Sequence, residues 1–260
     1  MKKLLISAIA FGTLITIISC EKERIITYDG PDAIEFYPVA RTVYTPTFVY
    51  PDSAKIQFVA PQRVNDAKVT YGIDATNSTA VAATDYQITG TTGETAVPAN
   101  TSFAFIKYNL SPATASKKLI FTLSGGDNVK VSENYKTHTL TIAPTPVIFT
   151  PNTKAITFAG STATIRDTVR VRLNATAARF SQPMTLNYTV RAASTAVEGT
   201  DYAFVSVKGV ATVPARSADA LVILDINPVA AQKTLVLDVT AVTGISLTTS
   251  TRIVTYTIKP

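Results

Sequence analysis

The sequence predicts an all-β fold of two tandem antiparallel β-sandwiches, and three observations lead to that prediction. The second half of the chain repeats the first, short segments alternate between apolar and polar residues, and branched and aromatic residues that suit pleated sheets are abundant. Hydrophobic residues make up 46% of the 260 residues and charged residues only 16%. A chain of this length and composition can bury the cores of one or two domains.

The internal repeat is the strongest of these observations. Residues 78–144 align with residues 194–260 without a gap, and 20 of the 67 aligned positions are identical, which is far more than chance gives. The identical positions include Thr84-Asp85-Tyr86 with Thr200-Asp201-Tyr202. A repeat of this length indicates that one structural unit occurs twice.

Two domains follow from the repeat, the first over residues 33–144 and the second over residues 147–260. The sequence Ala143-Pro144-Thr145-Pro146 joins them, and two prolines in so short a linker favour a stiff, extended connection. Each domain has room for about seven short strands, which is typical of an antiparallel sandwich of immunoglobulin-like shape.

Individual strands are indicated by runs of five or six residues that alternate with a period of two. Gly, Pro, Asn and Asp separate these runs, as expected for turns. The clearest runs are Ala54 to Val59, Leu119 to Leu123, Val169 to Leu173 and Leu235 to Val239.

Residues 1–19 have the layout of a secretory signal peptide. The chain starts with Met1-Lys2-Lys3, and the apolar run from Leu4 to Ile18 is too short to span a bilayer comfortably. The run ends in Ile17-Ile18-Ser19-Cys20, which resembles the lipobox of bacterial lipoproteins, although Ile17 stands where Leu is more common. The alternatives are a plain signal peptide with an incidental cysteine and an uncleaved helix.

The lipobox resemblance implies that Cys20 is the site of lipidation and that cleavage falls before it. Residues 20–32 would then be a lipidated tether, and acyl chains would anchor the protein to a membrane. The charged residues 21–24 resemble the export signal of surface lipoproteins in the Bacteroidota. We therefore expect a lipid-anchored protein at the outer membrane, on the cell surface, with the periplasmic face as the alternative.

A second resemblance is carried by Val197-Glu198-Gly199-Thr200-Asp201-Tyr202, with Gly209 to Pro214 after it. This stretch resembles the Calx-β module, an immunoglobulin-like sandwich. The first repeat has Thr84-Asp85-Tyr86 but lacks the glycine before Thr84. The two-domain layout also looks like small surface lipoproteins encoded beside glycan-uptake systems in the Bacteroidota.

The Asp-Tyr pairs have two interpretations. In the structural one, each aspartate accepts hydrogen bonds from backbone N–H groups of its turn, and each tyrosine buries its ring and offers its hydroxyl to the backbone. In the functional one, which the Calx-β resemblance suggests, acidic side chains at one end of the sandwich bind calcium. Its candidate ligands in the second repeat are Glu198, Asp201, Asp167, Asp225 and Asp238.

Catalysis is not predicted. His138 is the only histidine and falls in an expected strand, no serine lies in a Gly-x-Ser-x-Gly elbow, and no phosphate-binding loop occurs. A zinc site would need more ligands than one His and an acylated Cys. We expect no enzyme activity, no cofactor and no metal site. The net charge of +6 is not concentrated in a basic stripe, so no nucleic-acid partner is expected.

Binding at the cell envelope is the function that these observations favour. The expected partner is a glycan, a peptide or an outer-membrane protein. The alternative is a structural spacer or adhesin module, either with or without stiffening by calcium. An aromatic-rich segment is expected mostly to fill the first core, whereas exposed rings gathered in a patch would support binding. Its rings are Tyr28, Phe36, Tyr37, Tyr44, Phe48 and Tyr50.

Overall fold

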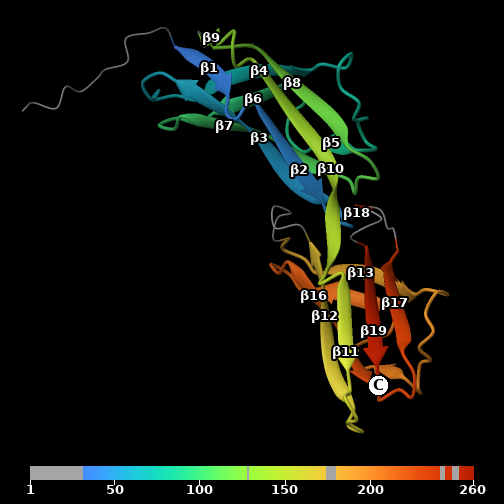
Figure 1. Ribbon diagram of the computed structural model, residues 1–260. Coiled ribbons are helices and arrows are strands. Elements are labelled where there is room, and N and C mark those ends of the chain that lie inside the picture. Colours follow the sequence, from blue (N-terminus) through green and yellow to red (C-terminus); the bar gives the residue numbers. More distant parts are fainter. Residues whose placement is uncertain (1–31, 128, 174–179, 241–243, 248–251) are drawn as a thin grey trace, which may run out of the picture. The chain divides into compact units, whose positions relative to one another are not determined.

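The computed structural model describes residues 32–127, 129–173, 180–240, 244–247 and 252–260. These residues form strands and turns, and no helix occurs among them. The predicted signal peptide, Cys20 and nearly all of the tether lie outside the described residues. The predicted all-β class is confirmed, and both halves of the described chain form β-sandwiches (Figure 1).

The first sandwich consists of two sheets that enclose one hydrophobic core. One sheet has the order β5-β7-β3-β1-β9, and strands β6-β4-β8-β10-β2 form the other. The strands are β1 (Ala33–Phe36), β2 (Ala40–Thr45), β3 (Tyr50–Val59), β4 (Ala67–Ile73), β5 (Tyr86–Ile88), β6 (Glu94–Val97), β7 (Phe103–Leu110), β8 (Lys117–Gly126), β9 (Lys130–Val131) and β10 (Thr137–Thr150).

The second sandwich repeats this arrangement around its own core. One sheet has the order β11-β19-β17-β13-β15, and the other is formed by β14-β16-β12-β10 with β18 beside β10. The strands are β11 (Thr153–Thr157), β12 (Ile165–Leu173), β13 (Met184–Val190), β14 (Tyr202–Phe204), β15 (Val210–Val213), β16 (Asp219–Ile226), β17 (Lys233–Val239), β18 (Ile245–Leu247) and β19 (Ile253–Lys259).

The period-two sequences place their apolar side chains inward, as predicted. In β12, Val169, Val171 and Leu173 are fully buried, while the arginines between them face outward. Burial of each such side chain contributes about 1.5–3 kcal/mol to stability. Most strand pairs are antiparallel, but four described pairs are parallel, namely β1 with β9, β2 with β10, β10 with β18 and β11 with β19. A parallel pair is possible because its two strands lie far apart in sequence.

Strand β10 contributes to both sandwiches. Its first part pairs with β8 and β2, and its last residues pair with β12 and β18 (Figure 1). Pro144 and Pro146 lie within this strand, so the linker is extended, as predicted from its prolines. The boundaries at residues 144 and 147 stay a prediction, because residues 32–260 form one compact unit.

Two buried threonines connect the strands beside the middle of β10. The Thr45 hydroxyl donates to the carbonyl of Ala143 at 3.3 Å and accepts from the Ala113 N–H at 2.8 Å. The Thr145 hydroxyl donates to the Thr45 carbonyl at 2.7 Å. The Gly244 N–H, just before β18, donates to the Ala113 carbonyl at 2.9 Å. Hydrogen bonds therefore join the two repeats away from β10 itself.

The aromatic-rich segment does not mainly fill the first core, so that expectation is wrong. Phe36 is buried in the first core, but three other rings pack against the second core, where Phe48 and Tyr50 contact Phe180 with centroids 5.9 and 5.6 Å apart. Tyr37 is 62% exposed, and Tyr28 lies outside the described residues. The three rings that pack against the second core are Tyr44, Phe48 and Tyr50.

His138 lies in strand β10, as expected, and is completely buried in the first sandwich. Its Nδ1–H donates to the carbonyl oxygen of Pro38 at 2.6 Å, because a carbonyl can only accept. The ring packs beside Phe36 and Phe121. Burial lowers the pKa of His138 below its ordinary value of 6.5, and the positive charge of Arg41 acts in the same direction.

This burial predicts acid sensitivity that begins at mildly acidic pH. Below pH 6.5 the unfolded chain protonates His138 while the folded chain does not, so the free energy of unfolding falls as the pH is lowered. Melting temperatures measured between pH 7.5 and 5 should decrease in the wild type and change less in His138→Phe. Equal slopes in both proteins would contradict this prediction. Asp219 and Asp225 have pKa values lowered by their arginine partners, so their contribution is lost only below pH 3.8.

Candidate functional site

The Gly-Thr-Asp-Tyr stretch of the second repeat forms a tight turn before β14. Asp201 is buried, its Oδ2 accepts from the Val197 N–H at 2.8 Å, and its own N–H donates to the Val197 carbonyl. Gly199 has a φ of +81°, a left-handed conformation in which its N–H reaches the Tyr202 carbonyl at 2.8 Å. The aspartate thus holds the turn, as the structural interpretation predicts.

The first repeat forms the same turn without the glycine. Ala83 takes the equivalent place with a φ of +62°, a conformation that costs an L-residue about 1–2 kcal/mol. The Asp85 carboxylate accepts from the Val81 N–H at 2.7 Å and from the Lys117 ammonium at 2.9 Å. The expected tyrosine hydroxyl bonds are absent from Tyr86 and Tyr202 among the described contacts.

Hydroxyl-to-backbone bonds are made instead by Tyr71 and Tyr188, which sequence reasoning had not selected. Tyr71 donates to the Thr91 carbonyl at 3.2 Å and Tyr188 to the Val207 carbonyl at 3.1 Å. The two tyrosines occupy corresponding strands, β4 and β13, and both rings are buried. Burial raises the pKa of each hydroxyl, which keeps both protonated at neutral pH.

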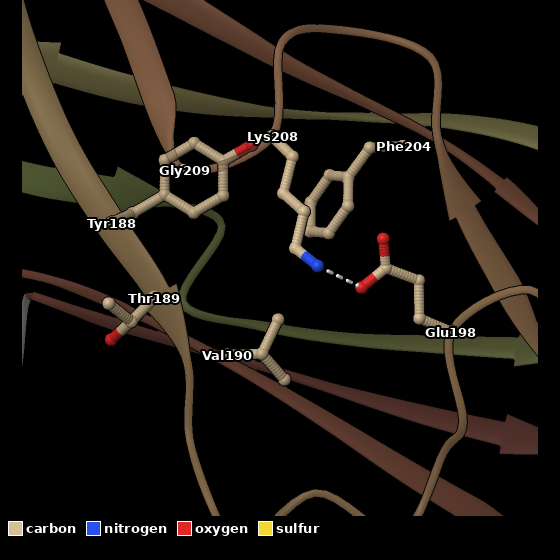
Figure 2. Close-up of a pocket in the computed structure, with 7 residues that line it drawn as sticks. All are labelled: Tyr188, Thr189, Val190, Glu198, Phe204, Lys208 and Gly209. Carbon is tan, nitrogen blue, oxygen red and sulfur yellow. Dashed lines mark hydrogen bonds and ion pairs between the residues drawn. The ribbon is translucent and has the colours of Figure 1, made fainter.

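A pocket of about 480 Å³ opens beside the turn of the second repeat. Figure 2 shows the Glu198 and Lys208 side chains reaching toward each other among the lining residues, and their Nζ and Oε2 atoms are 2.6 Å apart. Gly209, with a φ of +78°, lies at the Tyr188 end. The remaining wall is formed by Thr189, Val190 and Phe204. The ion pair neutralises the two charges, and the pocket has no nucleophile with an adjacent base.

The carboxylates that could hold calcium are not brought together. Glu198 pairs with Lys208, Asp201 with backbone, and no group of three or more His, Cys, Asp or Glu forms a cation site in the described part of the chain. The other three candidates each have a cationic partner. Those pairs are Asp167 with Lys154, Asp225 with Arg166, and Asp238 with Arg252.

A different surface gathers exposed rings on the first sandwich. On the outward face of β7, Phe103 is 38% exposed and Phe105 is 44% exposed, and Lys107 follows on the same face. On the neighbouring strand β3, Lys55 lies directly opposite Phe105, and its ammonium lies 3.6 Å from the centroid of the Phe103 ring. We call Lys55, Phe103, Phe105 and Lys107 the Phe–Lys patch.

A groove of about 390 Å³ runs along this patch between strands β6 and β7. Phe103, Phe105 and Lys107 form one wall. Thr95, Ala96, Pro98 and Thr101 form the other. Sequence reasoning missed the patch, because every residue from Phe103 to Ile106 is apolar and the alternation does not tell which side faces water. The second repeat could have revealed the outward face, because it has Asp219 at the position of Phe103 and Leu221 at the position of Phe105. An aspartate at that position indicates that the side chain faces water.

The predicted lipidation site, Cys20, cannot be placed relative to either surface, because it lies outside the described residues. Among the residues that are described, none belongs to a helix long and apolar enough to cross a bilayer.

No protein-family model and no curated protein matches the sequence. Among solved structures, the chain is similar to CBD12 from CALX1.2, with 17% identity, a TM-score of 0.40 and coverage of 80% of this chain and 79% of that one. It is also similar to the calcium binding domain CBD12 of CALX1.1, with 16% identity, a TM-score of 0.42 and coverage of 78% and 79%. A third is the collagen adhesin of S. aureus, with 9% identity, a TM-score of 0.22 and coverage of 89% and 96%. These identities carry no ligand or activity over to this chain.

Proposed function

We propose that this chain is a lipid-anchored accessory protein of the bacterial outer membrane that acts by binding and performs no catalysis. The Phe–Lys patch is the observation that carries the binding role. Two partly exposed phenylalanine rings and two lysines share one face of β3 and β7, beside a groove large enough for a small ligand. Exposed apolar rings that gather beside a groove are typical of a surface that a partner covers.

The lipid anchor is proposed from Cys20 and the leader before it. The sandwiches supply the binding face, and the acyl chains on Cys20 would supply attachment to the membrane. Each buried methylene of an acyl chain contributes about 0.8 kcal/mol, so two or three chains anchor a protein of this size stably. Surface display on a bacterium of the Bacteroidota, near a glycan-uptake system, is part of this proposal.

Labelling of living cells tests the anchor. Cells that express the full-length protein and take up an alkyne analogue of palmitate should show the label on the wild-type protein and none on Cys20→Ala. His138→Phe, which changes the only histidine and leaves the leader intact, is the control and should be labelled like the wild type. An unlabelled wild type, or a wild type found in the cytosol, would sink the proposal.

A spacer or adhesin is the second candidate, and strand β10 favours it. One continuous strand that belongs to two sandwiches suits a protein that connects other parts. The two candidates differ in what the Phe–Lys patch does. A spacer keeps its role when the patch is changed, whereas a binding protein loses its ligand.

A further inference from the structure

The second sandwich provides an internal comparison for the Phe–Lys patch. Both sandwiches have the same strand pairing, so Phe105 opposite Lys55 on β3 corresponds to Leu221 opposite Arg170 on β12. Phe103 corresponds in the same way to Asp219. The fold therefore tolerates an aspartate and a leucine where the first repeat has two phenylalanines. Stability of the sandwich does not explain these rings.

The charges of the two faces also differ. In the second sandwich, Arg172 forms a bidentate ion pair with Asp219, in which Nε and Oδ1 are 2.8 Å apart and Nη2 and Oδ2 are 3.2 Å apart. This pair neutralises the Asp219 charge. In the first sandwich, neither Lys55 nor Lys107 forms an ion pair with any described residue. The contact with the Phe103 ring holds Lys55 in place while its charge stays uncompensated. The patch therefore offers two positive charges to a ligand.

The groove next to the patch adds hydroxyl groups. Thr95 and Thr101 each donate their hydroxyl hydrogen to a carbonyl, of Phe105 at 3.2 Å and of Pro98 at 2.8 Å. Each oxygen keeps lone pairs that accept a hydrogen bond from a ligand. Apolar rings, acceptor oxygens and the Lys107 side chain thus line one space of about 390 Å³, and the Lys55 ammonium lies beside it, over the Phe103 ring.

An added peptide strand does not suit this edge of β7. The Phe105 carbonyl already accepts from the Thr95 hydroxyl of β6, so this backbone acceptor on the edge of β7 is engaged within the protein. A peptide that adds to a sheet edge depends on such backbone groups. The side chains that remain accessible match instead a ring with an apolar face, hydroxyl groups and a negative charge.

We propose that the Phe–Lys patch binds an acidic glycan. The apolar face of a sugar ring stacks on Phe105, while Lys55 and Lys107 bind the carboxylate of that sugar or of its neighbour. The hydroxyls of Thr95 and Thr101 accept hydrogen bonds from sugar hydroxyls. This inference rests on the proposed binding role and specifies its ligand as a uronate- or sialate-containing oligosaccharide.

A glycan array tests the proposal with the full-length protein in detergent micelles. The array carries uronate- and sialate-containing oligosaccharides, each beside its carboxyl-reduced form, and a set of acidic peptides. The wild type should bind acidic oligosaccharides and bind their carboxyl-reduced forms at least about tenfold more weakly, because the reduced forms lack the charge. Raised salt should weaken the binding.

Two variants and a control assign the binding to the patch. Phe105→Leu, which copies the second repeat, should lower affinity about tenfold, as should Lys55→Gln combined with Lys107→Gln. Leu221→Ala, at the corresponding place in the second sandwich, should bind like the wild type. Unchanged melting temperatures will show that all variants are folded. No binding to any acidic oligosaccharide, equal binding of reduced forms, binding of acidic peptides alone, or full affinity in Phe105→Leu would each overturn the proposal.

Failure of this test is distinct from failure of the proposed function. The array reads out binding by purified protein, whereas the proposed anchor is read out by palmitate labelling in cells. A labelled protein that ignores acidic glycans would retain the envelope role and lose only this ligand.

Discussion

Gly244→Ala should lower the free energy of unfolding by about 2–5 kcal/mol. Gly244 has a φ of +86°, and a methyl group at its Cα would lie 2.2 Å from the Pro46 carbonyl oxygen. The substitution therefore places an alanine in the left-handed backbone conformation. Its methyl group also clashes with the Pro46 backbone, which cannot rotate away as a side chain could. The backbone of Gly244 itself is also held in place. Its N–H donates to the Ala113 carbonyl, and its carbonyl accepts from the Thr145 N–H.

Gly160→Ala is the matched control for this experiment. Gly160 has nearly the same conformation, with a φ of +84°, but a methyl group there would meet nothing within 4 Å. Its cost should be about 1–2 kcal/mol from the backbone conformation alone. Urea denaturation of both variants measures the difference. Equal losses would mean that the close approach of Gly244 to Pro46 contributes nothing to stability.

Asp52→Ala should also be strongly destabilising, by about 2–4 kcal/mol. Asp52 accepts from the Arg41 guanidinium at 2.5 Å and from the Tyr108 hydroxyl at 3.3 Å, with 13% of its side chain exposed. Its loss leaves the Arg41 charge half inside the first sandwich without a counter-ion. The effect stays below that of a fully buried pair because 31% of the Arg41 side chain is exposed to water.

A double variant separates the ion pair from its surroundings. Arg41→Met with Asp52→Leu should be more stable than Asp52→Ala, since no charge is then left alone. If the losses of the single variants Arg41→Met and Asp52→Leu, measured by urea denaturation, simply add in the double variant, Arg41 and Asp52 do not stabilise each other.

Comparison of the two repeats in sequence does not reveal that the ion pairs of Arg41 and Lys154 are equivalent. Arg41 lies opposite Leu140 and Lys154 lies opposite Tyr256, and the gap-free repeat aligns Leu140 with Tyr256. The cations are therefore equivalent, but they are 113 residues apart whereas the gap-free repeat has a shift of 116. The loops between strands differ in length in the two repeats, so the spacing of the two cations differs from the repeat shift. Because one cation is an Arg and the other a Lys, the two positions also do not appear as an identity in the alignment.

The strands were easier to predict than the contacts between distant segments. Alternation places Val169, Val171 and Leu173 correctly because the period of a strand is a local property. The packing of Tyr50 against Phe180 joins segments separated in sequence by more than the length of one domain, and no local pattern encodes it. The Phe–Lys patch was missed for a related reason, because its outward face is apolar too.

The calcium and turn interpretations of Asp201 differ only in what surrounds the carboxylate. Sequence supplies the residue types, and both interpretations need an aspartate at this place. In the structure the Oδ2 atom of Asp201 accepts from the backbone N–H of Val197, which is the contact that the turn interpretation requires. The first repeat forms the same turn with Ala83 in place of the glycine. The substitution changes only the conformational free energy of the turn, because an alanine is strained at a positive φ.

Strand β10 makes the two halves of this protein inseparable in practice. A cut near residue 144 would end a strand in the middle of its hydrogen bonding and would expose Tyr44, Phe48 and Tyr50 to water. The other fragment would lose the rings that cover Phe180. Each fragment would thus expose an apolar surface that is buried in the intact chain, and such a surface favours aggregation. We therefore expect that neither half stays soluble when it is expressed without the other.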